Sequence, residues 1–171
     1  MSQRALDRAR ALFGDKIVTT HAFHGDETII IDGKDAHLVL ETLRTDTDPE
    51  TGALDFLVDL TAVDWYGSAD DRPRFEVVYH LRSMKTGDRL RVKAQLAMPE
   101  DGTEPVIDTV ADLWKSANWM EREVYDMFGI KFRGHPDLRR ILMYEEFIGY
   151  PLRKDYPKEK RQPLVRRDPN T

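Results

Sequence analysis

The sequence contains no cysteine. Disulfides, a catalytic thiol, zinc thiolate sites and cysteine-ligated iron–sulfur clusters are therefore impossible within this chain. Its ten glycines stand singly, so it has no glycine-rich phosphate loop, and no serine lies in a nucleophile-elbow sequence. If the protein works in a redox system, the redox centres belong to other chains.

Long apolar runs are also missing. None approaches the roughly 20 residues that cross a bilayer, and residues 1–15 lack the apolar core of a secretion signal. These residues alternate charged and apolar side chains, which predicts an amphipathic helix; an Arg-rich organellar presequence is the alternative, disfavoured by Asp7 and Asp15. With 171 residues, 33% of them charged, and a mean hydropathy of −0.58, we expect one domain of a soluble protein. The expected location is the cytoplasm or a cytoplasm-facing membrane surface.

Charge divides the chain into two parts. Residues 131–171 hold eleven basic and six acidic side chains, a formal charge of +5, whereas residues 1–130 carry a formal charge of −10. The basic part has no sustained helical or strand period, yet it is richer in aromatic and aliphatic residues than disordered tails are. Structureless loops of this length are also uncommon inside a compact domain. We therefore predict a folded domain over 1–130 and an extended, basic, partner-binding arm over 131–171.

Hydrophobic periodicity predicts the elements of the first part. Strands are expected over 17–22, 28–31, 56–62, 75–82 and 90–96, with a turn at 24–26, and a helix is expected over 36–44. A further helix is expected to open at Pro105, and the last helix is expected to start at Asn118 with a capping box to Glu121 and to end at Gly129. The strands alternate apolar and polar residues, as in a sheet with one wet side. The predicted class is α+β: a mainly antiparallel sheet with helices packed on one face, followed by the long extended C-terminal arm.

Carboxylates and a histidine lie on and just after the last predicted helix, and these residue types are typical of metal-binding or acid–base sites. Glu123, Asp126, His135 and Asp137 form the set for a metal-dependent hydrolase. The stronger interpretation is electrostatic, because acidic residues stabilise a helix N-terminus and Arg122 can pair with Asp126. No histidine lies on the predicted helix, so the spacing of a diiron helix is absent. We expect no catalytic, cofactor-binding or metal-binding residue in this chain.

The basic arm has two interpretations. Basic residues interleaved with aromatic ones are typical of single-strand nucleic-acid binders, but the whole chain has a formal charge of −5 and five prolines interrupt the arm. Arginine and tyrosine are also enriched in protein interfaces, which is the interpretation we favour. The residues expected to bind a partner protein, by pairing with its carboxylates or filling its pockets, are Arg139, Arg140, Tyr144, Phe147, Tyr150, Arg153, Lys154 and Tyr156. The tryptophans, Trp65, Trp114 and Trp119, are expected to be core or interface anchors.

Three stretches around and after the last predicted helix resemble a known signature. They read EREVYDMFGI at 121–130, GHPDLRRIL at 134–142 and GYPLRKDYP at 149–157, and DLTAVDW at 59–65 adds a weaker match. This pattern is similar to the C subunit of NADH–quinone oxidoreductase, respiratory complex I, a family that also supplies subunits of membrane-bound hydrogenases and photosynthetic NDH complexes. The signature residues are Glu121, Arg122, Glu123, Asp126, Phe128, Gly129, His135, Pro136 and Asp137.

The resemblance implies a structural subunit without a cofactor of its own. Such subunits lie in the peripheral arm, on the cytoplasmic side of the inner membrane, against the quinone-site subunit and the iron–sulfur subunit of the same complex. The resemblance implies an assembly that uses NADH, FMN, iron–sulfur clusters and quinone, and that couples electron transfer to proton translocation. A hydrogenase-type complex is the alternative, and no nucleic acid or membrane-spanning segment is expected.

Overall fold

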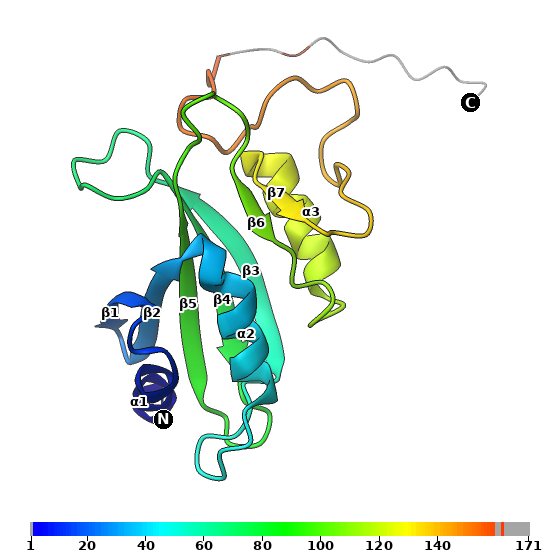
Figure 1. Ribbon diagram of the computed structural model, residues 1–171. Helices are drawn as coiled ribbons and strands as arrows, with labels where there is room; N and C mark the ends of the chain where they lie inside the picture. Colours follow the sequence, from blue (N-terminus) through cyan, green and yellow to red (C-terminus); the bar gives the residue numbers. More distant parts are fainter. Residues whose placement is uncertain (1, 160–161, 163–171) are drawn as a thin grey trace.

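The computed structural model describes residues 2–159 and 162; Met1, residues 160–161 and residues 163–171 lie outside the described residues, and with them the end of the predicted arm. Three α-helices and seven strands make up the described part (Figure 1). The helices are α1 (Ser2–Phe13), α2 (Ala36–Thr45) and α3 (Ala117–Phe128), with a short 3₁₀ turn at Gly33–Asp35. The strands are β1 (Ile17–Phe23), β2 (Asp26–Asp32), β3 (Phe56–Asp64), β4 (Phe75–Arg82), β5 (Arg89–Leu96), β6 (Val106–Asp108) and β7 (Lys131–Arg133).

Five strands form one sheet in the order β1-β2-β5-β4-β3. The β1–β2 hairpin turns through His24 and Gly25, which both have positive φ, as a two-residue turn requires. Neighbouring strands run antiparallel except β2 and β5, which are parallel; α2, β3 and β4 supply the long connection that a parallel pair needs. The predicted α+β class and the mainly antiparallel sheet are confirmed.

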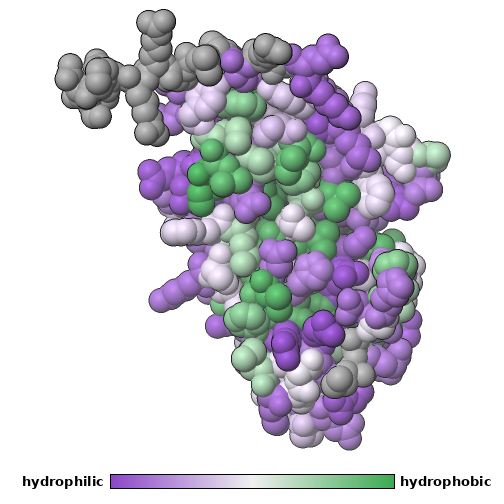
Figure 2. Space-filling model, turned by 180° about the vertical axis from the view of Figure 1, so that it is seen from behind, coloured by the Kyte–Doolittle hydropathy of each residue, from purple (hydrophilic) through white to green (hydrophobic). Residues whose placement is uncertain are grey.

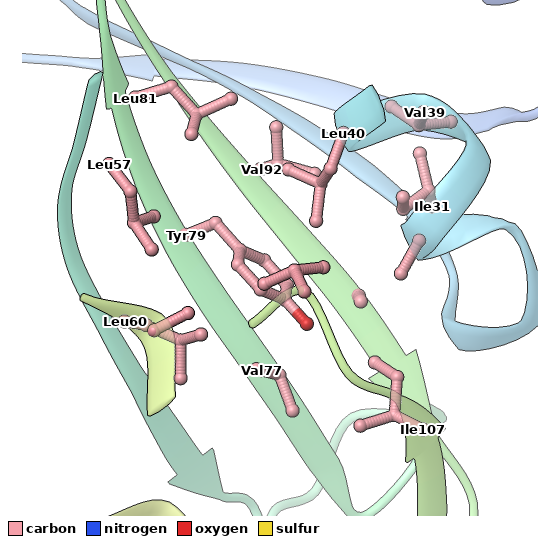
Figure 3. Packing of buried hydrophobic residues seen from close by; sticks show 14 of the residues in the cluster. Ile31, Val39, Leu40, Leu57, Leu60, Val77, Tyr79, Leu81, Val92 and Ile107 are labelled. Carbon is pink, nitrogen blue, oxygen red and sulfur yellow. The ribbon is translucent and has the colours of Figure 1, made fainter. Parts of the chain in front are cut away.

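The three helices contribute to a single hydrophobic core with one face of the sheet. Because side chains alternate along a strand, Val77, Tyr79 and Val92 point into this core. Figure 3 shows the Tyr79 ring between Leu60 of β3 and other buried side chains of the cluster. The Tyr79 hydroxyl is buried without a hydrogen-bond partner among the described residues. Burial raises the pKa of Tyr79 well above its ordinary value, so the phenol stays protonated.

The opposite face of the sheet is covered by its own long polar side chains. Lys93 Nζ lies 3.3 Å from Glu76 Oε2, and Gln95 Nε2 lies 3.4 Å from Glu76 Oε1. Glu76 is fully buried, although the alternation of β4 puts it on the face opposite the core. Figure 2 views the molecule from behind Figure 1 and shows apolar and polar side chains interspersed there. This face therefore mixes polar and apolar side chains, and Ile30 and Val78 are buried on it.

The prediction of a helix that begins at Pro105 is wrong. Val106–Asp108 forms β6, which pairs in parallel with β7, and Arg133 Nε donates to Asp108 Oδ1 at 2.5 Å across that pair. Pro105 precedes a strand as readily as a helix, and β-branched Val106 and Ile107 favour the strand. The decisive contact comes from β7, 25 residues later in the chain, which local periodicity does not see.

Helix α3 is confirmed, but the capping box is wrong. The helix begins at Ala117 after Ser116, with no side-chain capping bond, and Glu121 bonds elsewhere. Its predicted end at Gly129 is confirmed: φ is 72° and the Gly129 amide donates to Tyr125 O at 2.8 Å. None of the helices within the described ranges is long and apolar enough to span a membrane.

Candidate partner-binding site

Residues 134–159, called the C-terminal segment here, contain no helix or strand. The segment passes beside α3 and the end of β3 (Figure 1), and side chains from both elements bind it. It carries all of the residues that the sequence assigns to partner binding. Their positions decide whether they face a partner or this chain.

Two of the predicted arginines are paired within the chain. Arg140 Nη1 donates to Asp126 Oδ1 at 2.7 Å, and Arg153 Nε donates to Phe128 O at 2.5 Å. Arg139 is different, because its side chain is 72% exposed and pairs with the exposed Asp137, at 2.9 Å. Arg139 thus keeps a surface position, whereas Arg140 and Arg153 fasten the C-terminal segment to α3.

The aromatic residues of the segment pack mainly on one another. Tyr144 meets Phe147 edge-on at 5.7 Å between ring centroids, and Phe147 stacks on Tyr156 at 5.9 Å. The Tyr150 hydroxyl donates to Glu104 Oε1 at 3.1 Å, and burial, together with Glu104, raises the pKa of Tyr150 to about 12. These rings therefore give the segment a small apolar cluster of its own.

Asp126 is the central group of this site. It is fully buried on α3, and its Oδ2 accepts the amides of Ile141 at 3.1 Å, Leu142 at 2.8 Å and Met143 at 2.8 Å. Burial opposes ionisation, but the amide donors of Met143 and Leu142 and the guanidinium of Arg140 outweigh it and hold the pKa of Asp126 below its ordinary value. We name Asp126, Arg140 and the amides of 141–143 the Asp126 cluster.

Asp64 at the end of β3 makes a second such site, which we name the Asp64 cluster. The residue is 3% exposed, and its carboxylate accepts the Lys154 amide at 2.9 Å and the Tyr66 amide at 2.9 Å. Arg74 donates to both Asp64 oxygens at 3.1 Å and lies 2.7 Å from Asp155 Oδ2. Burial opposes the charge of Asp64, yet these donors, Arg74 first, hold its pKa below the ordinary value. Lys154, predicted to bind a partner, thus uses its backbone here, and its ammonium lies 5.8 Å from the Trp65 ring centroid.

Glu121 and His135 lie near the N-terminal end of α3. Glu121 is fully buried and accepts from Thr109 Oγ1 at 2.5 Å and from the Val110 amide at 2.7 Å. Burial raises the pKa of Glu121 from 4.5 to about 7, more than those two hydrogen bonds lower it. His135 Nδ1 accepts the Asp137 amide at 3.0 Å, which assigns the ring hydrogen to Nε2, 3.0 Å from Asn118 O.

The four residues of the hydrolase alternative do not form a metal site. Asp126 is occupied by its amides and Arg140, His135 uses both ring nitrogens, and Glu123 is exposed on α3. Over residues 2–159 and 162, no group of three or more His, Cys, Asp or Glu side chains could hold a metal ion. The signature residues instead bind one another and the backbone: Arg122, for example, donates to the carbonyl oxygens of Arg139 and Arg140, both at 3.2 Å.

Four large apolar side chains on α3 and the C-terminal segment are more than half exposed. The exposed fraction is 69% for Trp119, 58% for Leu142, 66% for Ile148 and 55% for Leu152. Trp119 precedes Arg122 by one helical turn, so it lies on the side of α3 that meets residues 139–140. Of these four, only Trp119 was predicted from the sequence, as a core or interface anchor. Nothing in the spacing of the three aliphatic residues distinguishes them from buried ones, because the segment has no period.

Comparisons with known proteins agree with one another. The family model of the respiratory-chain NADH dehydrogenase 30 kDa subunit matches residues 29–162. The C subunit of NADH-quinone oxidoreductase from Geobacter metallireducens is 43% identical over 156 residues, which covers 91% of this chain and 90% of that protein. The protein of the same name from Geotalea uraniireducens is 42% identical over 156 residues, covering 91% of this chain and 88% of the relative.

A solved structure shares the fold. It is a chain of the membrane-bound sulfane sulfur reductase, described as an archaeal respiratory membrane complex, with a TM-score of 0.69 and 22% identity. The alignment covers 99% of this chain and 97% of that chain. Since the family model spans most of the sequence and the relatives match nearly end to end, this chain belongs to the family of the 30 kDa subunit, or C subunit, of NADH–quinone oxidoreductase-type respiratory complexes.

Proposed function

We propose that this chain is a structural subunit of the peripheral arm of a proton-translocating NADH–quinone oxidoreductase, on the cytoplasmic side of the membrane. It carries no flavin, iron–sulfur cluster or quinone itself. It holds the quinone-site subunit and the iron–sulfur subunit in place while electrons pass from NADH through FMN and iron–sulfur centres to quinone. Family membership over nine-tenths of the chain supports this assignment.

The observation that carries the proposal is the set of uncovered apolar side chains, Trp119, Leu142, Ile148 and Leu152, which we name the docking surface. These side chains lie on one helix and on the segment that packs beside it, and exposed large apolar residues on neighbouring segments often mark a protein interface. Tryptophan contributes strongly to binding when it inserts into a partner. Arg139, exposed beside this surface, supplies a charge for a partner carboxylate.

The experiment is recovery of the complex through a tag on this chain after gentle solubilisation of membranes. We expect the quinone-site and iron–sulfur subunits to be recovered with it, together with NADH-dependent quinone reduction. In the double variant Trp119→Ala, Leu142→Ala we expect at least a roughly tenfold loss of recovered subunits, because interface tryptophans often cost about 2 kcal/mol or more on truncation.

Phe23→Ala is the matched control, because Phe23 is 67% exposed but lies at the β1–β2 turn, away from α3. Equal recovery of the two partner subunits with the double variant and the control would contradict the docking surface. The electron donor of the recovered complex distinguishes the proposed function from the hydrogenase alternative. A complex that oxidises hydrogen and not NADH would contradict the proposed function and support the alternative.

A further inference from the structure

An irregular segment at an interface can be ordered in two ways. Either the partner orders it on binding, or the chain orders it beforehand. If the partner orders the segment, the loss of conformational entropy weakens binding by roughly 1–2 kcal/mol for each backbone residue that is fixed. The contacts made by the segment's own backbone distinguish the two routes.

The first contact is the Asp126 cluster. A single carboxylate oxygen receives three successive amides, those of residues 141–143, which form a concave backbone site around a negative charge. The Arg140 side chain also binds Gly149, nine residues further along the segment. Its Nη1 donates to Asp126 Oδ1, while its Nη2 donates to Gly149 O at 3.1 Å. The stretch from 140 to 149 is thereby closed into a loop on α3.

The second contact is the C-terminal end of α3. The last carbonyl groups of a helix have no partners within it. Here the Leu152 amide donates to Met127 O at 3.1 Å, and Arg153 binds the carbonyl oxygens of Phe128 and Gly129 at 2.5 and 3.5 Å. The segment therefore completes hydrogen bonding that the helix leaves open.

The third contact is the Asp64 cluster, which binds the Lys154 amide 90 residues away in the chain. Two parts of the segment, residues 141–143 and residues 152–154, are thus fixed by buried groups of this chain alone. Each of the two carboxylates involved is accompanied by an arginine, Arg140 or Arg74, that compensates its charge.

Two leucines of the segment are held by their backbone amides and also belong to the exposed apolar side chains of the docking surface. Leu142 and Leu152 donate their amides to groups of α3, while their side chains remain 58% and 55% exposed. The backbone bond fixes the direction in which each side chain projects.

We propose that the docking surface is preorganised: Asp126, Asp64 and the end of α3 hold the C-terminal segment in its bound conformation before any partner subunit arrives. The inference rests on the proposed function for the identity of the partner, another subunit of the complex. The partner meets a finished surface and does not fold the segment.

Hydrogen exchange on the purified full chain, alone and in the recovered complex, tests this. In the chain alone we expect the amides of 141–143, 152 and 154 to exchange about 100-fold or more slowly than in an unfolded chain. Exchange of these amides at unfolded rates in the free chain, with protection gained only in the complex, would overturn the proposal.

Two variants add specificity. Asp126→Asn puts an amide NH₂ against either Arg140 or the three amides, so we expect at least roughly tenfold faster exchange at 141–143 and little change at 154. Asp64→Asn should do the reverse, and Glu123→Gln, an exposed site on α3, should change neither. Retained protection of the Tyr79 and Val92 amides in the core shows that each variant is folded.

Unchanged protection at 141–143 in the folded Asp126→Asn variant would contradict the assigned cause. The hydrogen-exchange test can succeed or fail independently of the test of the proposed function. A free chain with a protected segment that recruits no subunit from the membrane would support preorganisation and contradict the proposed partner.

Discussion

At the scale of single residues, three buried carboxylates organise the surroundings of α3 in different ways. Asp126 has an arginine and three amides, Asp64 has an arginine and two amides, and both have pKa values below the ordinary value. Glu121 has two donors and, among the described residues, no arginine in a salt bridge with it, and its pKa is raised to about 7. Asp126 and Asp64 therefore stabilise the fold as anions, whereas Glu121 stabilises it most when protonated.

Replacing Glu121 by glutamine should change how stability depends on pH. Because the folded-state pKa lies above the ordinary 4.5, the stabilisation from Glu121 is fully present below about pH 4.5 and is lost as pH rises through 7. At about 1.4 kcal/mol per pKa unit, the loss is on the order of 3 kcal/mol. We expect Glu121→Gln to match the parent near pH 4.5 and to be more stable near pH 8.

Urea unfolding at the two pH values measures this difference. Glu123→Gln, on the exposed side of the same helix, is the control and should keep the parent's pH dependence. Parallel pH curves for the parent and Glu121→Gln would show that Glu121 is ionised in the folded chain well below pH 7.

At the scale of elements, the end of α3 depends on a glycine for two reasons. Gly129 has φ of 72°, and a Cβ at this position would lie 2.6 Å from Arg153 Nη2 and closer still to Tyr150. The left-handed conformation costs an ordinary residue roughly 1–2 kcal/mol, and the crowding displaces the two side chains that close the helix. The helix end and the C-terminal segment are therefore coupled through this position.

Gly129→Ala should lower the free energy of unfolding by more than the backbone cost alone. We expect a loss of about 2–4 kcal/mol, measured by denaturant unfolding, with faster exchange of the Leu152 amide. Gly102→Ala is the matched control, because Gly102 has φ of 74° but nothing within 4 Å of its Cβ position. Equal losses in the two variants would show that Tyr150 and Arg153 move aside freely.

At the scale of the whole molecule, the helices and the five-stranded sheet share one core. Residues of α1, α2 and α3 belong to a single buried cluster with β2 to β5, and Phe132 of β7 joins it. Such a core has no internal boundary at which part of the chain could unfold first. The four exposed apolar side chains of the docking surface lie outside it, on α3 and the C-terminal segment.

Unfolding of the core is therefore expected to be cooperative. Tryptophan fluorescence, to which buried Trp114 contributes, and far-ultraviolet circular dichroism should give the same urea midpoint. Exchange of the core amides should follow the same transition. Two separated midpoints would mean that α3 and the sheet unfold independently, contrary to the shared cluster.

The fold was predictable wherever the signal was local. Period-two alternation in β3, β4 and β5, the amphipathic α1 and α2, and the glycine after α3 each indicated the correct element, because neighbours within a few residues determine them. The short parallel pair of β6 and β7 was not predicted, since each strand has three residues and its partner is distant in the chain.

By itself, the sequence determined that this chain holds no thiolate-bound redox centre, that its sheet has one apolar face, and that it resembles the C-subunit family of respiratory complex I. Only the tertiary structure decided which carboxylates are buried and what they bind. Asp126 and Glu123 look alike in the sequence, yet one receives three amides and an arginine while the other faces solvent. Most of the partners of these carboxylates lie 10 to 90 positions away in the chain, and no local pattern encodes contacts of that range.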